Sequence, residues 1–274
     1  MAPASTRPAT KCSIAVSSGN SWQIPSLVHR VWLGDHVPDG VLATEDAWRL
    51  HFPDYQLRLW RDADVERLGM PGHYWHARTY AERSDIARYR ILWHCGGIYA
   101  DCDLRPLQRF DHLWHGKDRL IVFHENSHLL LNGLIIARPH DQAIKMIIRF
   151  SDRNARLLSP LAAPNVRTGP FALTAAVDYA RELDPSRIRL YPVGFVHVSG
   201  QIPGHAVAST PIQETPIWAT VPSHQRNDGS SSKGVRVVRE VLSDTMTAIV
   251  LLPLRVRRRL RRLGSSRRRS AVWR

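Results

Sequence analysis

The residues best suited to chemistry in this sequence are Asp101 and Asp103, two acids separated by a single residue. They follow a short apolar segment, Ile98-Tyr99-Ala100, which is typical of a buried strand. In extended chain, residues two apart face the same side, so both carboxylates can enter one cleft at a sheet edge. Neighbouring carboxylates repel each other unless a cation or an array of hydroxyl groups lies between them. The pair therefore predicts a divalent metal ion that carries a diphosphate.

Two other interpretations of the Asp-x-Asp pattern stay open. Because so short a motif is common, both acids can be ordinary loop residues that follow a strand. A phosphatase-type nucleophile is the second alternative. That motif usually follows a longer apolar strand and precedes Gly-Thr or a similar pair, whereas Leu104-Arg105-Pro106 follows here.

The segment upstream of the two acids reads as an amphipathic helix that stops at Gly96-Gly97. Asp85, Arg88 and Tyr89 lie three and four residues apart, so they share one face of this helix. The two glycines can supply a left-handed cap and a sharp turn into the strand. If Asp85 and Arg88 form only an exposed ion pair, it contributes at most about 1 kcal/mol.

The complete string over residues 84–103 is Ser-Asp-x-x-Arg-Tyr-x-x-Leu-x-x-x-Gly-Gly-Ile-Tyr-x-Asp-x-Asp. It resembles glycosyltransferase family 32, the DxD-containing sugar-binding region shared with fungal Golgi α-1,6-mannosyltransferases. It is also similar to the glucosyltransferase domain of large clostridial toxins. The resemblance implies a GT-A-like α/β fold and a retaining, metal-dependent transfer of a hexose from a UDP- or GDP-sugar to a glycan or lipid-linked acceptor.

The resemblance also implies roles for four residues of the string, which together form the expected catalytic set. Asp103 would bind Mn²⁺ or Mg²⁺, and Asp101 would contact ribose or sugar hydroxyls and bind the metal directly or through water. Asp85 and Arg88 would orient the donor sugar through hydrogen bonds.

The resemblance also makes three further residues candidates, each with a plainer alternative. Trp32 would stack on the nucleotide base, or it is a core residue at the sheet edge. Asn132, beside Gly133, would contact the donor sugar, or it marks a bulge. His224 would complete the metal site, or it is an exposed loop residue; the Ser-Trp that commonly follows in relatives is missing here.

The remaining elements fit an α/β fold with a mixed central sheet and flanking helices. The patterns predict strands over residues 26–34, 56–60, 119–124 and 129–137. They predict helices over 39–50, 139–149 and 168–183, with Asp62 capping another. We expect a disordered segment over residues 1–21, a GT-A-like domain over 22–234, and an amphipathic, Arg-rich tail over 235–274.

Charge is concentrated at the end of the sequence. Ten arginines and no acid follow residue 254, and removing them lowers the formal charge from +14 to +4. Such a run beside a short apolar stretch favours binding to an anionic membrane surface; nucleic acid or plain solvation are alternatives. No segment is long enough to be a signal peptide or membrane span, and the three cysteines suit a reduced compartment. These patterns predict a cytoplasmic enzyme, peripheral on the inner face of the membrane.

The resemblance suggests a place in polysaccharide or glycolipid biosynthesis. The sequence is also compatible with two other functions. The protein can be a non-enzymatic basic protein that binds membrane or nucleic acid, in which the acids are merely structural. It can also be a metal-dependent phosphotransferase, which would release phosphate instead of a nucleotide.

Overall fold

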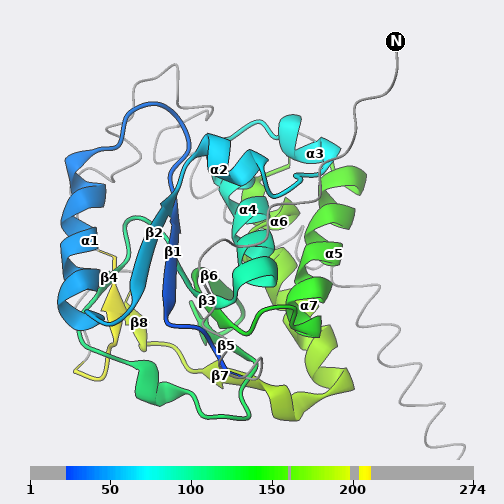
Figure 1. Cartoon of the computed structure of the whole chain (residues 1–274). Helices are drawn as coiled ribbons and strands as arrows, with labels where there is room; N and C mark the ends of the chain where they lie inside the picture. Colours follow the sequence, from blue (N-terminus) through cyan, green and yellow to red (C-terminus); the bar gives the residue numbers. More distant parts are fainter. Residues whose placement is uncertain (1–22, 160–161, 198–203, 211–274) are drawn as a thin grey trace, which may run out of the picture. The chain divides into compact units, whose positions relative to one another are not determined.

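The computed structural model describes residues 23–159, 162–197 and 204–210, built around a six-stranded sheet (Figure 1). The strand order is β2-β1-β3-β6-β5-β7. In chain order, their bounds are β1 Leu27–Val31, β2 Gln56–Trp60, β3 Gly97–Ala100, β5 Leu120–His124, β6 Leu130–Ala137 and β7 Ile188–Tyr191.

The sheet is mixed. Strand β1 runs parallel to both β2 and β3, β6 runs antiparallel to β3 and β5, and β7 runs parallel to β5. A smaller sheet in the order β4-β9-β8 combines Arg105–Pro106, Ala208–Ser209 and Val196–His197. The expected α/β architecture with a mixed central sheet and flanking helices is therefore confirmed.

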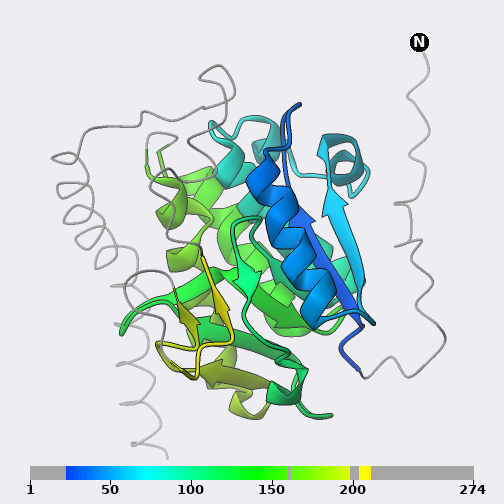
Figure 2. The same ribbon diagram turned by 90° about the vertical axis from the view of Figure 1, so that its left-hand side faces the viewer.

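Helices cover both faces of the large sheet (Figures 1 and 2). Helix α1, Asp39–His51, lies on one face, and α4, Tyr80–Cys95, packs on the other with α5, Gln142–Leu157, and α7, Pro170–Leu183. The shorter helices are α2 Asp62–Glu66, α3 Gly72–Trp75 and α6 Pro164–Arg167, with 3₁₀ turns at Asp111–Leu113 and Pro185–Arg187.

The two faces of β1 explain why the sheet is buried on both sides. Leu27 and Val31 pack in the cluster that includes residues of α4, α5 and α7, whereas Val28 packs with Trp48 and Phe52 of the α1 side. Successive strand residues point to opposite faces, so a strand covered on both sides needs apolar residues at both parities. Strand β1 has this pattern, with Leu27 and Val31 on one face and Val28 on the other.

Helix α4 and the turn after it position the acidic motif. The side chain of Thr79 caps the helix by accepting a hydrogen bond from the Glu82 backbone N–H at 3.1 Å. Gly96 and Gly97 follow with φ of +64° and +92°. A Cβ on Gly97 would lie 2.6 Å from the Leu27 carbonyl oxygen. The predicted glycine turn is confirmed, and only glycine fits so close to β1 in this backbone conformation.

Several predicted bounds need correction. Helix α5 begins at Gln142 and extends to Leu157, because Asp141 caps it by accepting from the Ala143 N–H at 2.8 Å. The cap of α2 is Arg61, whereas Asp62 lies inside the helix and accepts a hydrogen bond from the Gly34 N–H. The segment 69–76, for which no element was predicted, contains the one-turn helix α3.

His29 of β1 uses both of its ring nitrogens in hydrogen bonds within the protein. It is fully buried, and its Nδ1 accepts from the indole N–H of Trp60 at 3.1 Å. Since an indole only donates, Nε2 must carry the proton that is donated to the Gly96 carbonyl at 2.9 Å. The ring is therefore held neutral, and burial lowers its pKa from 6.5 to about 4.

We expect this imidazole to make the fold sensitive to acid. The unfolded chain takes up the proton from about pH 6.5 downward, and the folded chain only near pH 4. As the pH falls from about 6.5 to about 4, protonation of His29 in the unfolded chain therefore lowers the free energy of unfolding by up to about 3 kcal/mol. Urea unfolding at several pH values measures it. A His29→Gln variant should lack this term, and equal pH slopes for the two proteins would contradict the assignment.

Candidate functional site

The acidic motif begins where β3 ends. The Asp101 N–H donates to the Gly133 carbonyl of β6 at 2.8 Å, which extends the pairing of the two strands by one residue. The carboxylate of Asp101 accepts from the Tyr99 hydroxyl at 2.8 Å. A Cβ on Gly133 would lie 2.8 Å from Asp101 Oδ2, so the absence of a side chain there leaves room for the carboxylate.

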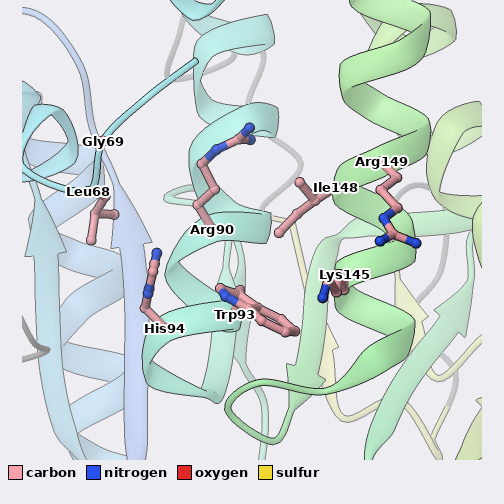
Figure 3. A pocket seen from close by; sticks show the side chains of 8 residues that line it. All are labelled: Leu68, Gly69, Arg90, Trp93, His94, Lys145, Ile148 and Arg149. Carbon is pink, nitrogen blue, oxygen red and sulfur yellow. The ribbon is translucent and has the colours of Figure 1, made fainter. Parts of the chain in front are cut away.

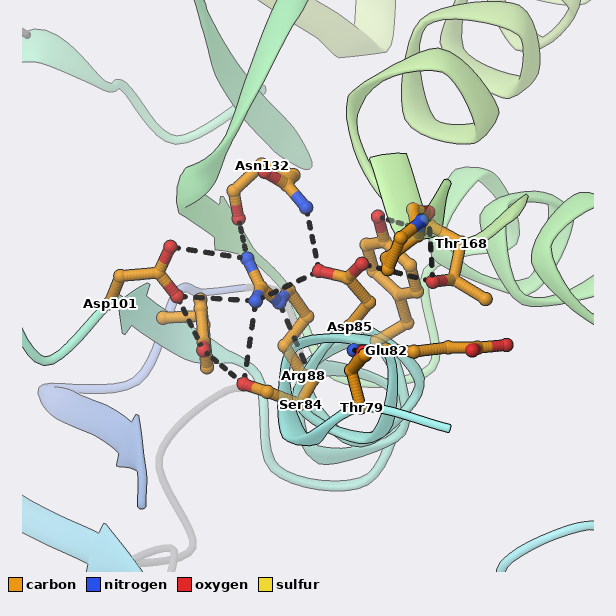
Figure 4. Close-up of polar contacts among 11 residues, drawn as sticks. Thr79, Glu82, Ser84, Asp85, Arg88, Asp101, Asn132 and Thr168 are labelled. Atoms are coloured by element: carbon orange, nitrogen blue, oxygen red, sulfur yellow. Dashed lines mark hydrogen bonds and ion pairs between the residues drawn. The ribbon is translucent and has the colours of Figure 1, made fainter. Parts of the chain in front are cut away.

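Arg88 joins the helix to this motif. Its guanidinium is 4% exposed and lies 2.9 Å from Asp85 Oδ1 and 3.2 Å from Asp101 Oδ1 (Figure 4). It also donates to the Asn132 carbonyl at 2.6 Å and lies over the ring of Tyr99, with the guanidinium carbon 4.7 Å from the ring centroid. The exposed ion pair that the spacing alone allowed is therefore wrong; the pair is buried and shared with Asp101.

Asp85 is held from three sides. Its Oδ1 accepts from Arg88 and from the Asn132 side-chain amide at 2.8 Å, and its Oδ2 accepts from the Thr168 hydroxyl at 2.9 Å. The residue is 5% exposed, and burial raises its pKa to about 6 although Arg88 lowers it. Tyr89 supports the same corner, because its hydroxyl donates to the Thr168 carbonyl at 2.9 Å.

We use the term carboxylate network for Asp85, Arg88, Asp101 and Asn132. Four of the predicted site residues thus come together from α4, the end of β3 and β6 (Figure 4). The bulge that was the alternative prediction for Asn132 is also present. The register of the pairing between β5 and β6 shifts between Val122 and Phe123 of β5. Asn132 therefore lies in an irregular stretch of β6 and also contacts Asp85.

Asp103 differs from Asp101 in its surroundings. Burial and the neighbouring Asp101 carboxylate raise the pKa of Asp103 to about 6. Among the described residues, no side chain donates a hydrogen bond to its carboxylate, whereas Asp101 accepts from Tyr99 and Arg88. Asp103 therefore keeps the oxygen lone pairs that a hard cation needs.

Trp32 stands apart from the network. Trp32 donates its indole N–H to the His36 carbonyl at 2.6 Å and packs, partly exposed, against a small cluster that includes Val41 and Cys102. The stacking of Trp32 on a base stays a prediction. His224 lies outside the described residues.

The metal-ligand chemistry can be tested on the residues that the structure describes. In residues 23–159, 162–197 and 204–210, no group of three or more His, Cys, Asp or Glu side chains is arranged to hold a metal ion. Two carboxylates fit a different kind of site, in which Mg²⁺ or Mn²⁺ is bound by one or two acids while substrate phosphates supply further oxygens. Asp103, with its free lone pairs, and Asp101 fit that kind of site.

Sequence reasoning missed three contributors to the site: the Tyr99 hydroxyl, Gly133 and Thr168. The sequence pattern includes Thr168 only as the start of the helix predicted over 168–183. Its contact with Asp85 joins residues 83 positions apart, and no local pattern signals such a contact.

The domain boundaries predicted at residues 22 and 234 lie outside the described residues and stay predictions. The tail lies outside the described residues, so its binding to a membrane and the peripheral location stay predictions. None of the helices in the described part combines the length and the apolar character needed to cross a bilayer.

Comparison with known proteins gives a family match within the N-terminal half of the chain. The model of the glycosyltransferase sugar-binding region containing DXD motif matches residues 38–120. This segment includes Asp85, Arg88, Asp101 and Asp103, and the predicted resemblance is thereby confirmed over it.

The chain is also similar in sequence to two fungal proteins that are named for a mannosyl transfer or a mannosyl product. Inositol phosphoceramide mannosyltransferase 2 of Schizosaccharomyces pombe is 26% identical over 168 residues, which cover 58% of this chain and 48% of that protein. Mannosyl phosphorylinositol ceramide synthase CSH1 of Saccharomyces cerevisiae is 33% identical over 97 residues, 33% of this chain and 26% of that protein. The chain therefore spans about half the length of the first relative and about a quarter of the second.

Among solved structures, the PaToxG glycosyltransferase is similar with a TM-score of 0.46 and 18% identity, covering 59% of this chain and 70% of that chain. The catalytic domain of alpha-toxin from Clostridium novyi has a TM-score of 0.41 and 10% identity, covering 59% of this chain and 64% of that chain.

Proposed function

Because residues 38–120 of this chain belong to the glycosyltransferase sugar-binding region containing DXD motif, we propose that the protein is a retaining, metal-dependent hexosyltransferase. In this proposal it uses a nucleotide-diphosphate sugar as donor and a glycan or glycolipid as acceptor. The observation that carries the proposal is the buried carboxylate network beside Asp103, whose own carboxylate receives no side-chain donor from the described residues.

Asp103, together with Asp101, would hold Mn²⁺ or Mg²⁺. Bound there, the ion would supply Lewis-acid stabilisation of the charge that grows on the diphosphate as the sugar leaves. Protonation prevents a carboxylate from acting as a ligand, and the pKa of Asp103 is raised to about 6. The metal-free protein should therefore bind the ion more tightly above about pH 6, where Asp103 is charged.

Arg88 and Asp101 would bind and orient the donor. The Arg88 guanidinium is fixed by Asp85 and the Asn132 carbonyl, so it does not need to be ordered when substrate binds. Asp101 accepts from Tyr99 and Arg88 and retains acceptor capacity for ribose or sugar hydroxyls. Asp85 accepts three hydrogen bonds within the protein, so we propose that it acts on the sugar mainly by fixing Arg88 and Asn132.

Retention at the anomeric carbon needs either a covalent intermediate or an attack from the same face. We propose the same-face route, in which the acceptor hydroxyl attacks the anomeric carbon while its proton passes to the departing phosphate oxygen. The reason is that the carboxylates of the network are engaged in ion pairs and hydrogen bonds. A sugar adduct trapped on one of these carboxylates would overturn this route.

The acceptor and the donor sugar are proposed from the relatives. The names of these relatives describe transfer of mannose to inositol phosphoceramide. A lipid-linked acceptor and a GDP-mannose donor are therefore the first compounds to test. UDP-hexoses complete the donor panel.

The test measures thermal stabilisation and turnover of the full chain with UDP- and GDP-sugars, with and without Mn²⁺. Metal-dependent stabilisation by one donor, with release of its nucleotide, would support the proposal. Release of inorganic phosphate would instead indicate a phosphotransferase. No stabilisation and no turnover with any donor would favour a non-enzymatic binding protein.

The contact between Thr168 and Asp85 gives a prediction within the site. Replacing Thr168 by valine removes the hydroxyl donor at nearly constant volume and leaves a buried acceptor without its bond. We expect a stability loss of about 1–3 kcal/mol. Because this hydrogen bond lowers the pKa of Asp85, its loss should raise the pKa of that carboxyl, which an NMR titration of the Asp85 side chain measures. Thr168→Ser should restore both properties, and an unchanged Asp85 pKa in the valine variant would contradict the role.

A further inference from the structure

A hollow of about 300 Å³ is lined by residues of helices α4 and α5 and by Leu68 and Gly69 (Figure 3). Its polar lining is basic, and none of the described residues that line it is acidic. The residues that matter for the inference are Arg90, Trp93 and His94 on α4 with Lys145, Ile148 and Arg149 on α5.

This hollow is separate from the candidate active site. Arg90 follows Arg88 by two residues, which is a rotation of about 200° around a helix. Trp93 and His94 lie three and four residues after Arg90 and therefore share its face. A ligand in the hollow would thus lie on the opposite side of α4 from Asp85 and Arg88.

The hollow carries an excess of positive charge. Arg90 is 9% exposed, and its charge is balanced by Asp152, whose two oxygens each lie 2.9 Å from Arg90 Nη2. Lys145 and Arg149 lie one turn apart on α5, and neither forms an ion pair with an acid of the described residues. Two cationic groups are therefore free to meet an anion.

The walls of the hollow limit the kind of anion. The Lys145 ammonium lies 5.6 Å from the ring centroid of Trp93, which provides an apolar wall together with Ile148. The imidazole of His94 lies beside them, and its pKa is lowered, first by burial and then by His140 and Arg90. It is therefore neutral at pH 7 and can donate one ring N–H.

We propose that this hollow binds a phosphoryl group through Lys145 and Arg149, with the indole of Trp93 against the organic part of the ligand. The planar fork of an arginine and the point charge of a lysine are both common ligands of phosphate oxygens. The volume admits a phosphate together with a ring or a glycerol unit. Free phosphate and the headgroup of a phospholipid share this chemistry, and experiment must separate these two sources.

The test compares the full chain with its Lys145→Gln/Arg149→Gln variant and with Arg153→Gln as a matched control. Arg153 is an exposed arginine one turn beyond Arg149 on α5, outside the lining of the hollow. Calorimetric titration with inorganic phosphate at constant ionic strength covers the free anion. Sedimentation with phosphatidylcholine vesicles, with and without phosphatidic acid, covers the lipid. The Arg-rich tail is common to all three proteins, so it cannot cause a difference between them.

We expect the double variant to bind at least about tenfold more weakly than the wild type in one of the two assays, and the control to match the wild type. A loss confined to the titration identifies a free phosphate ligand, and a loss confined to the vesicles identifies a lipid headgroup. If the double variant equals the control in both assays, the proposal is overturned. Donor turnover is measured in parallel, and its failure would bear on the hexosyltransferase proposal alone.

Discussion

An Arg88→Met variant is expected to lose about 3–5 kcal/mol of unfolding free energy at pH 7 and all measurable sugar transfer. The guanidinium lies 2.9 Å from Asp85 and 3.2 Å from Asp101, and it is 4% exposed. Removing it leaves Asp85 as a buried, uncompensated charge, which is costly in a poorly solvated site. Urea unfolding measures the stability, and nucleotide release from a donor sugar measures the activity.

Two further variants separate the structural role of Arg88 from its proposed role with substrate. A double variant, Arg88→Met with Asp85→Leu, replaces the buried pair by apolar groups and should regain much of the stability without regaining turnover. Arg49→Met is the control for loss of an arginine: Arg49 is exposed on α1 and pairs with Glu45 at 2.6 Å, so we expect a change of at most about 1 kcal/mol. Wild-type stability in Arg88→Met would contradict the charge balance described here.

The local features of the site could be read from the sequence because they depend on spacing along the chain. Asp85, Arg88 and Tyr89 share a helix face by the helical repeat, and two glycines with positive φ end α4 as expected. The strand Ile98-Tyr99-Ala100 was equally clear, because apolar residues at both parities indicate burial on two sides.

The burial of the polar face of α4 could not be predicted in this way. Charged residues on one helix face ordinarily indicate solvent, and this face is covered instead by the irregular part of β6 and by the turn before α7. Those contacts join Asp85 to Asn132 and Thr168, which lie 47 and 83 residues away. Pattern reasoning has no access to such separations, and only the resemblance pointed to Asn132.

The separate environments of Asp101 and Asp103 were also invisible in the sequence. Their spacing only places both carboxylates on one side of an extended chain, and their different roles were given by the resemblance alone. In the structure Asp101 accepts from Tyr99 at 2.8 Å and is paired with Arg88, and the pKa of Asp103 is raised by burial and by Asp101. Proximity to Arg88 thus divides the motif into one oriented acid and one acid with free lone pairs.

The different surroundings of the two acids lead to the second prediction, which concerns the turnover and stability of an Asp103→Asn variant. We expect metal-dependent turnover of the donor to fall by about 100- to 1000-fold, the usual cost of losing a group that stabilises charge in the transition state. Stability should move in the opposite direction. Since burial and Asp101 disfavour the charged form of Asp103, a neutral amide should leave the unfolding free energy at pH 8 unchanged or raise it by about 1 kcal/mol. Nucleotide release and urea unfolding measure the two properties.

A loss of turnover without a loss of stability is what distinguishes a metal ligand from an acid that only supports the structure. If Asp103 served only to hold the loop, its replacement would lower stability and turnover together. Asp46→Asn, an exposed acid on α1, controls for the loss of one negative charge and should change neither property. In the wild type at limiting Mn²⁺, turnover should decline as pH falls through about 6, because protons compete with the metal for Asp103, and added Mn²⁺ should offset the decline. Turnover in Asp103→Asn that equals the wild type at saturating Mn²⁺ would remove Asp103 from the metal site and return both acids to the role of ordinary loop residues.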